Sequence, residues 1–141
     1  MSAFWDTSAI VHVCVPGQAS RAAKDLLGRE TSVIWWMAPV EVRSALEHLL
    51  AEGAVGGAAY EASKRRLHEL LGSWREIQPT DNVREQAYAQ LERFRLRASD
   101  ALHLAAALVW CKQKPRGRLF ICNDVRLARA GRQLGFDVVS V

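Results

Sequence analysis

The sequence predicts an α/β fold, with a central, mostly parallel sheet of four to five short strands flanked by helices. The first reason is that short apolar segments of strand character alternate with longer segments of helical periodicity along the chain. The second is that 141 residues, 50% of them hydrophobic and 24% charged, can build one sizeable core but not two. No internal repeat, linker or low-complexity segment interrupts the pattern. We therefore expect residues 1–141 to form a single domain.

The chain up to residue 71 contains two predicted strands and four predicted helices. The strands are residues 3–5, a short apolar run, and residues 31–37, which are rich in β-branched and aromatic residues. Helical patterns run from Asp6 to the stop at Pro16, from Ser20 to Leu27, from Pro39 to Gly53 and from Ala54 to Leu71. Glycine is common just after a helix, so Gly28 and Gly53 are expected to end helices.

The rest of the chain contains three predicted strands and three predicted helices. The strands are residues 74–77, 119–122 and 136–141, and helical patterns run from Thr80 to Phe94, from Ser99 to Val109 and from Asp124 to Leu134. Thr80 and Ser99 are residues of the kind that cap helices. The helix after Ser99 is apolar on nearly every side, which is typical of a buried helix.

Four acidic residues lie where strands end or helices begin. Asp6 and Asp124 closely follow predicted strands, and Glu41 and Asp100 lie in the first turns of predicted helices. Because strand ends and the helix starts that follow them share one edge of a parallel sheet, the four carboxylates are expected to converge there. Taken singly, each acid could instead cap a helix or favour its dipole, a role that contributes about 0.3–1 kcal/mol.

A cluster of four carboxylates needs a compensating positive charge. Two carboxylates about 4 Å apart repel by roughly 4 kcal/mol at an effective dielectric constant of about 20, and a helix N-terminus offsets only ~1 kcal/mol. Mg²⁺ and Mn²⁺ prefer carboxylate oxygen and keep bound waters. The pattern therefore predicts a site for a divalent cation. Its ligands would be Asp6, Glu41, Asp100 and Asp124.

The segments around these acids resemble those of a known family. They are Asp6-Thr7-Ser8 after the first strand, Glu41 in Pro-Val-Glu-Val, Asp100 in Ser-Asp-Ala-Leu-His-Leu-Ala-Ala-Ala, and Asp124 in Asn-Asp-Val-Arg-Leu-Ala. In this order they resemble the PIN-domain nucleases over the whole chain. The length and the ending Gly-Phe-Asp-Val-Val look like the VapC-type ribonuclease toxins within that family. The resemblance implies a single PIN-like nuclease domain over residues 1–141.

The resemblance implies an endoribonuclease that depends on one or two Mg²⁺ or Mn²⁺ ions. The metal-binding and catalytic residues would be Asp6, Glu41, Asp100 and Asp124. Such a cation can activate water for in-line attack on a phosphodiester. Ser8, two residues after Asp6, would orient that carboxylate. Many relatives carry Thr or Ser two residues before the fourth acid, where this chain has Cys122. A thiol is a weaker hydrogen-bond donor, and Asn123 is the candidate to replace it.

The resemblance also implies partners. RNA would be the substrate, a small antitoxin protein would neutralise the enzyme, and the protein would be a homodimer. Candidate RNA-binding residues, weighed against an interpretation as solvated surface charges, are Arg43, Lys112, Lys114, Arg116 and Arg118. His103, one helical turn after Asp100, is expected to be a packed structural residue. Of Trp35 and Trp36, one indole is expected in the core and the other on the surface.

Two other functions stay open: a PIN nuclease of RNA processing without an antitoxin, and a catalytically silent PIN-like module that binds RNA or protein. No apolar run is long enough for a membrane span and no basic segment precedes the first apolar residues, so we expect neither a membrane protein nor a signal peptide. Three cysteines without C-x-x-C spacing favour reduced thiols and a cytoplasmic location.

Overall fold

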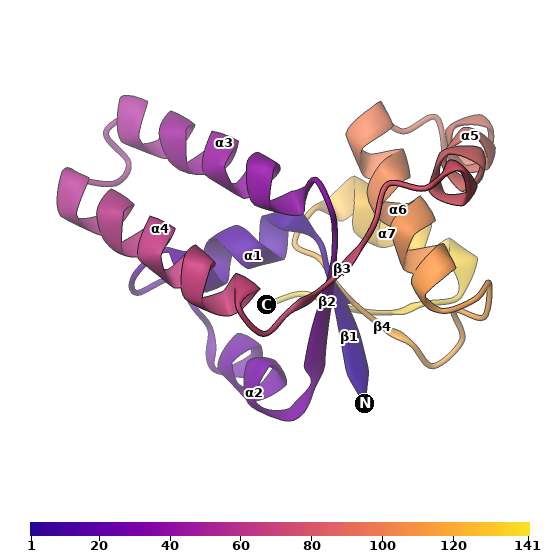
Figure 1. Cartoon of the computed structure of the whole chain (residues 1–141), viewed down its shortest axis with the longest axis horizontal. Helices are drawn as coiled ribbons and strands as arrows, with labels where there is room; N and C mark the ends of the chain where they lie inside the picture. Colours follow the sequence, from indigo (N-terminus) through magenta and orange to yellow (C-terminus); the bar gives the residue numbers. More distant parts are fainter.

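A five-stranded parallel sheet forms the centre of the computed structural model, which describes residues 1–141 (Figure 1). The strands are β1 (Ser2–Trp5), β2 (Thr31–Trp35), β3 (Arg75–Ile77), β4 (Leu119–Ile121) and β5 (Asp137–Val139). Their order is β3-β2-β1-β4-β5, and every neighbouring pair is parallel. The predicted α/β fold is therefore confirmed. The order reverses between β1 and β4, and open sheets of this kind bind ligands outside the carboxyl ends of such strands.

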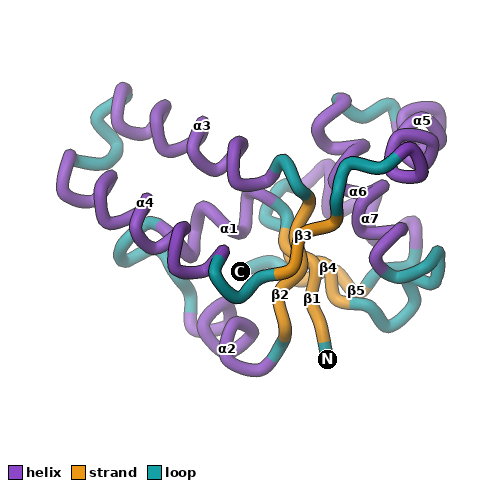
Figure 2. The backbone as a smooth tube through the Cα atoms, viewed as in Figure 1, coloured by secondary structure: helices purple, strands orange, loops and turns teal.

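Seven helices cover the two faces of the sheet (Figure 2). One face carries α1 (Thr7–Cys14), α2 (Arg21–Arg29), α3 (Ala38–Ala51) and α4 (Gly57–Leu71). The other carries α5 (Asp81–Phe94), α6 (Ala98–Trp110) and α7 (Val125–Leu134). In Figure 1, α3 and α4 form a hairpin that extends away from the sheet, on the side opposite to α5, α6 and α7. None of the seven helices is both long and apolar enough to cross a bilayer.

Side chains of the inner strands alternate between two separate cores. Those that face α5, α6 and α7 are Phe4, Val33 and Phe120. Those that face the other four helices are Trp5, Ile34 and Ile121. Successive residues of a strand point to opposite faces, so a strand that is buried on both faces has a continuous apolar sequence. This is why short apolar runs predict the three inner strands correctly.

Of the two glycines predicted to end helices, Gly53 does so and Gly28 does not. Gly28 does not end α2, which continues to Arg29. A glycine inside a helix costs about 1 kcal/mol relative to alanine, which a helix with other support tolerates. Gly53 follows the end of α3 with a φ of 73°, and its N–H donates to the Leu50 carbonyl, as predicted for a glycine that ends a helix. The next helix begins at Gly57 rather than at Ala54.

Ser99 does not cap α6. The helix begins one residue earlier than predicted, at Ala98, and the preceding Arg97 makes no side-chain hydrogen bond to the helix start. Alanine has the highest helix propensity, so Ala98 extends the helix backward and moves Ser99 into the first turn. Asp100 nevertheless stays in that first turn, as predicted. Asp100 therefore lies at the N-terminal end of the buried helix, as expected.

Replacing Phe120 by alanine is expected to lower the free energy of unfolding by about 3–5 kcal/mol, because it leaves a cavity in a packed core. The Phe120 ring is fully buried, stacks on Phe4 at a centroid distance of 5.7 Å and lies 5.5 Å from the Phe136 ring. Urea unfolding followed by tryptophan fluorescence measures the loss. Val40→Ala, at a residue that is 65% exposed, is the control. Equal losses in the two variants would contradict this assignment of the core.

Candidate functional site

Four separate segments bring the predicted acids to the carboxyl edge of the sheet. Asp6 directly follows β1, and Asp124 lies between β4 and α7. Glu41 and Asp100 lie in the first turns of α3 and α6. Burial raises the pKa of Asp100, and the charges of Asp124, Asp6 and Glu41 raise it further, against the opposing charge of His103. His103 contacts both Asp6 and Glu41, and Asp100 and Asp124 line one hollow. The four carboxylates thus gather at this edge, and we call them the acid cluster.

Asp6 is held firmly at the start of α1. Its Oδ2 atom accepts hydrogen bonds from the Ser8 backbone N–H at 3.2 Å and from the Ser8 hydroxyl at 2.6 Å. The Ser8 hydroxyl in turn accepts a hydrogen bond from the Asn123 N–H at 2.9 Å, which joins the ends of β1 and β4. Asp6 is 4% exposed. It is both the cap of α1 and a member of the acid cluster, so the two interpretations of its position are compatible.

His103 lies between two of the acids. It is 1% exposed, with Nδ1 at 3.4 Å from Asp6 Oδ1 and Nε2 at 3.0 Å from Glu41 Oε2. The Thr7 hydroxyl donates to the same Glu41 oxygen at 3.1 Å and lies 3.2 Å from His103 Nε2. The expectation of a packed histidine is right about burial but misses these contacts. The three-residue spacing from Asp100 is the sequence signal for His103, and Thr7 belongs to the Asp6-Thr7-Ser8 segment.

The two neighbouring carboxylates make His103 more basic. Burial lowers the pKa of His103, but the charge of Asp6 and the hydrogen bond and charge of Glu41 outweigh it, so the pKa lies above its usual value. A protonated imidazole donates through both ring nitrogens, and here a carboxylate lies beside each. A protonated His103 would therefore place one positive charge between Asp6 and Glu41.

The chemistry of the donor atoms fits a hard divalent cation, because the acid cluster offers carboxylate oxygens. Glu41 Oε1 is buried and has no hydrogen-bond partner, so it is available as a ligand. Its other oxygen is engaged by His103 and Thr7. In this arrangement no three His, Cys, Asp or Glu side chains are spaced to hold one metal ion. The residues fit the cation by type, and their side chains would have to move to surround it.

Cys122 contributes to the site through a protonated thiol. Its Sγ atom lies 3.4 Å from the Asp124 carbonyl oxygen and 3.6 Å from Asp6 Oδ2. Burial, followed by the charge of Asp6, raises the pKa of Cys122 well above its usual value. The thiol therefore stays protonated and donates, in the position where relatives were expected to carry a hydroxyl.

The Asn123 side chain does not support Asp124, contrary to the prediction. Its amide nitrogen donates to the Val141 carbonyl at 2.7 Å, and its amide oxygen accepts from the Val141 N–H at 2.8 Å and from the Ser140 hydroxyl at 3.0 Å. The Asn123 side chain thus holds the end of the chain against the loop after β4. Asp124 itself caps α7 by accepting from the Leu127 N–H at 2.9 Å.

The basic residues predicted to bind RNA do not surround the acid cluster. The loop between α6 and β4 contains Lys112, Lys114, Arg116 and Arg118. This loop precedes β4, so it lies at the amino edge of the parallel sheet, opposite to the acid cluster. Arg43 of α3 lines a separate hollow together with Lys64 and Arg65 of α4.

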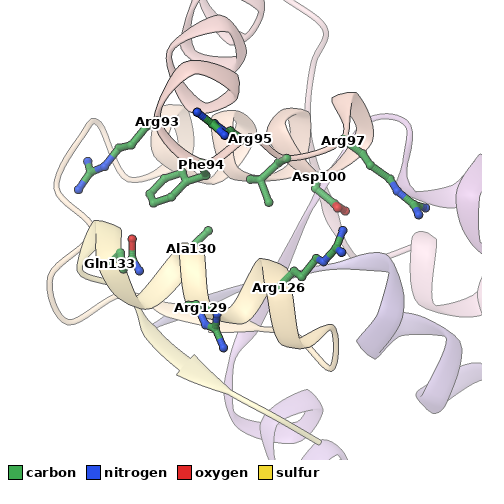
Figure 3. Close-up of a pocket in the computed structure, with 10 residues that line it drawn as sticks. Arg93, Phe94, Arg95, Arg97, Asp100, Arg126, Arg129, Ala130 and Gln133 are labelled. Carbon is green, nitrogen blue, oxygen red and sulfur yellow. The ribbon is translucent and has the colours of Figure 1, made fainter.

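A groove of about 470 Å³ beside Asp100 contains arginines that sequence reasoning missed (Figure 3). It lies between the α5–α6 connection and α7, and we call it the arginine groove. Its lining residues are Arg93, Phe94, Arg95, Leu96, Arg97, Asp100, Arg126, Arg129, Ala130 and Gln133. The two arginine groups are far apart in sequence, so only the fold shows that they share one groove.

Comparisons with known proteins agree with this fold. A family model described as the PIN domain matches residues 3–133. The solved toxin–antitoxin complex from Klebsiella pneumoniae is 18% identical, with 87% of each chain covered and a TM-score of 0.62. VapBC2 from Rickettsia felis, bound to a DNA fragment from its promoter, is 13% identical, with 99% of this chain and 98% of that chain covered and a TM-score of 0.68. VapBC-1 from nontypeable Haemophilus influenzae is 13% identical, with 98% of each chain covered and a TM-score of 0.66. A comparison with curated proteins found no significant match.

The free energy of unfolding, measured in EDTA, is expected to fall as the pH rises through the raised pKa of His103. A folded-state pKa above the unfolded value stabilises the fold fully below about pH 6.5, and that stabilisation is lost above the folded value. Asp100, whose pKa is also raised, acts with the same sign from about pH 4 upward.

Urea unfolding at a series of pH values measures this dependence. His103→Gln should flatten the curve above about pH 6.5. His48→Gln, at an exposed position of α3, should leave the curve as in the wild type. An unchanged slope in His103→Gln would contradict the assignment to His103.

Proposed function

The chain belongs to the PIN domain family, and from that premise we propose that it is an endoribonuclease that depends on a divalent cation. Members of this family are generally nucleases. The proposed metal-binding and catalytic residues are Asp6, Glu41, Asp100 and Asp124. The proposed cation is Mg²⁺ or Mn²⁺, because these ions bind carboxylate oxygens and keep waters in their coordination shell.

The mutual charge of the acid cluster carries this proposal. After burial, the charges of Asp124 and Asp6 are the largest causes of the raised pKa of Asp100. Holding these carboxylates together in their ionised form costs free energy, and a positive charge offsets that cost. His103 supplies at most one positive charge against four carboxylates. A divalent cation supplies the charge that is still needed.

The protein's own residues would position the ligands. Ser8 fixes Asp6 through two hydrogen bonds, and Thr7 holds one oxygen of Glu41. Glu41 is the side chain that would turn to complete the site, because its Oε1 atom is buried without a partner. A bound cation would supply charge stabilisation of the phosphodiester transition state and a lower pKa for the attacking water.

Asp100→Asn is expected to lower RNA cleavage by several orders of magnitude, because it removes a ligand charge and nearly preserves the size of the side chain. A labelled RNA with single-stranded loops is incubated with Mg²⁺ or Mn²⁺, and the products are separated on a gel. EDTA should abolish cleavage by the wild type. Equal cleavage by the wild type and Asp100→Asn would indicate a contaminating nuclease and would refute the assignment.

Asp25→Asn is the matched control, because Asp25 is exposed on α2 and lies outside the acid cluster. It should cleave as the wild type does. The wild type and these two variants also serve to test metal binding by thermal unfolding. An ion that binds only the folded state raises the melting temperature. Mn²⁺ should raise the melting temperature of the wild type and Asp25→Asn but have little effect on Asp100→Asn. A catalytically silent module would show no cleavage in any variant.

We also propose that a small antitoxin protein binds next to the acid cluster. Three of the similar solved structures are toxin–antitoxin or VapBC assemblies by their descriptions. Large apolar side chains are exposed just before Glu41: Trp36 is 45% exposed, Met37 37% and Val40 65%. Apolar side chains gathered on a surface mark interaction sites. Trp35 is only 3% exposed, so one indole of the pair lies in the core and the other on the surface, as predicted.

Expression of this chain alone in a bacterial host is expected to arrest growth, and co-expression of a small protein encoded beside it should restore growth. Asp100→Asn, expressed to the same soluble level, is the matched control and should not arrest growth. Normal growth despite soluble wild-type protein would favour the alternative, a PIN nuclease of RNA processing without an antitoxin.

A further inference from the structure

We propose that the arginine groove binds an unpaired nucleotide of single-stranded RNA next to the phosphate that is cleaved. This inference rests on the proposed endoribonuclease activity and specifies the substrate class of that site. It assigns RNA binding to the α5–α6 connection and α7, and not to the loop between α6 and β4.

The groove has more positive than negative side chains, and its arginines form no ion pair. Five of its ten lining residues are arginines, and Asp100 is the one acid among them. All five arginines are exposed, and none forms an ion pair with a carboxylate. Arg66 and Arg84, elsewhere in the chain, do pair with acids. An accumulation of unpaired guanidinium groups in one hollow points to an anionic ligand, and guanidinium groups match phosphate oxygens in geometry.

Two elements contribute the lining residues of the groove. Arg95 ends α5 in the left-handed conformation, with φ 52° and ψ 42°, which turns the chain so that residues 95–97 line the groove. On α7 the lining residues are Arg126, Arg129, Ala130 and Gln133, a spacing that puts them on one face of the helix. In Figure 3, the Arg126 side chain extends toward Asp100 from the opposite wall.

The groove opens directly onto the acid cluster. A second hollow of about 350 Å³ adjoins it and is lined by Arg97, Ser99, Asp100, Asp124, Val125 and Arg126. The two hollows share Arg97, Asp100 and Arg126. An RNA backbone that passes between the two shared arginines therefore reaches two of the four acids. The arginines neutralise the phosphates that would otherwise be repelled by the carboxylates.

The apolar lining residues of the groove favour an unpaired base. Phe94, Leu96 and Ala130 are its apolar lining residues, and the Phe94 ring lies over the space between the α5–α6 connection and α7 (Figure 3). The Arg93 guanidinium lies 5.0 Å from the centre of the Phe94 ring, so a flat cation and a ring are both available for stacking. Proteins recognise single-stranded RNA by stacking splayed bases on aromatic and guanidinium planes. In a duplex the bases are paired and cannot enter.

The test measures binding of a fluorescein-labelled single-stranded oligoribonucleotide by fluorescence anisotropy, in EDTA so that no cleavage occurs. The double variant Arg126→Gln with Arg129→Gln should bind about tenfold more weakly, and the slope of log affinity against log salt should fall by about 0.7 per lost phosphate contact. Arg132→Gln is the matched control, because Arg132 is an exposed arginine of α7 that does not line the groove. It should bind almost as the wild type does.

Two further measurements test whether the groove binds a base and whether it prefers a single strand to a duplex. Phe94→Leu should weaken binding of the single strand with no change in salt slope, and the same strand annealed to its complement should bind the wild type more weakly than the single strand. Equal losses in the double variant and Arg132→Gln would overturn the inference, as would wild-type affinity in the double variant.

The result is distinguishable from failure of the proposed activity. Binding in EDTA needs no working metal site, so a wild type that binds RNA through the groove but never cleaves would refute the nuclease and retain the groove as the RNA site. A wild type that cleaves, alongside a double variant with unchanged binding and cleavage, would refute the groove alone.

Discussion

Four carboxylates share one edge of the sheet, and their mutual repulsion has to be offset wherever the fold brings them together. Helix starts, hydroxyl groups and one imidazole offset this repulsion. Asp6 and Asp124 cap helices, so each accepts hydrogen bonds from a helix start. Ser8 and Thr7 hold individual oxygens, and His103 places an imidazole between two acids. These contacts keep the carboxylates ordered, and the half-buried Asp100 still keeps a raised pKa. The acid cluster therefore favours the binding of a cation.

The apolar character of α6 is what brings Asp100 and His103 to this edge. Ala101, Ala105 and Ala106 of α6 are fully buried. Small side chains allow a helix to lie close to a sheet, and α6 consequently packs directly against β2. The same helix carries the desolvated acid and the buried histidine. A sequence that looks like a plain core helix thus delivers two polar groups to the acid cluster.

The sequence was sufficient for the parts of the site that depend on topology alone. Asp6 and Asp124 follow strands, and the ends of parallel strands share an edge whatever the side-chain rotamers are. The contact of His103 with Glu41 and Thr7 depends on rotamers of residues from three helices, so spacing could suggest it but not establish it. The hydrogen bonds of Asn123 to Val141 depend on where β5 leads the chain. The arginine groove depends on α7 lying beside the α5–α6 connection, which no local pattern encodes.

The order of the acids along the chain has a consequence for protein synthesis. β4 pairs with β1, so the edge that holds Asp6 is completed only by residues 119–124, late in the chain. A ribosome that adds about 5–20 residues per second needs on the order of ten seconds to reach that point. Until then the nascent chain has three acids and no closed switch point between β1 and β4. The proposed nuclease therefore lacks one of its four proposed catalytic acids until nearly the whole domain has been synthesised, and the proposed antitoxin can fold during that interval.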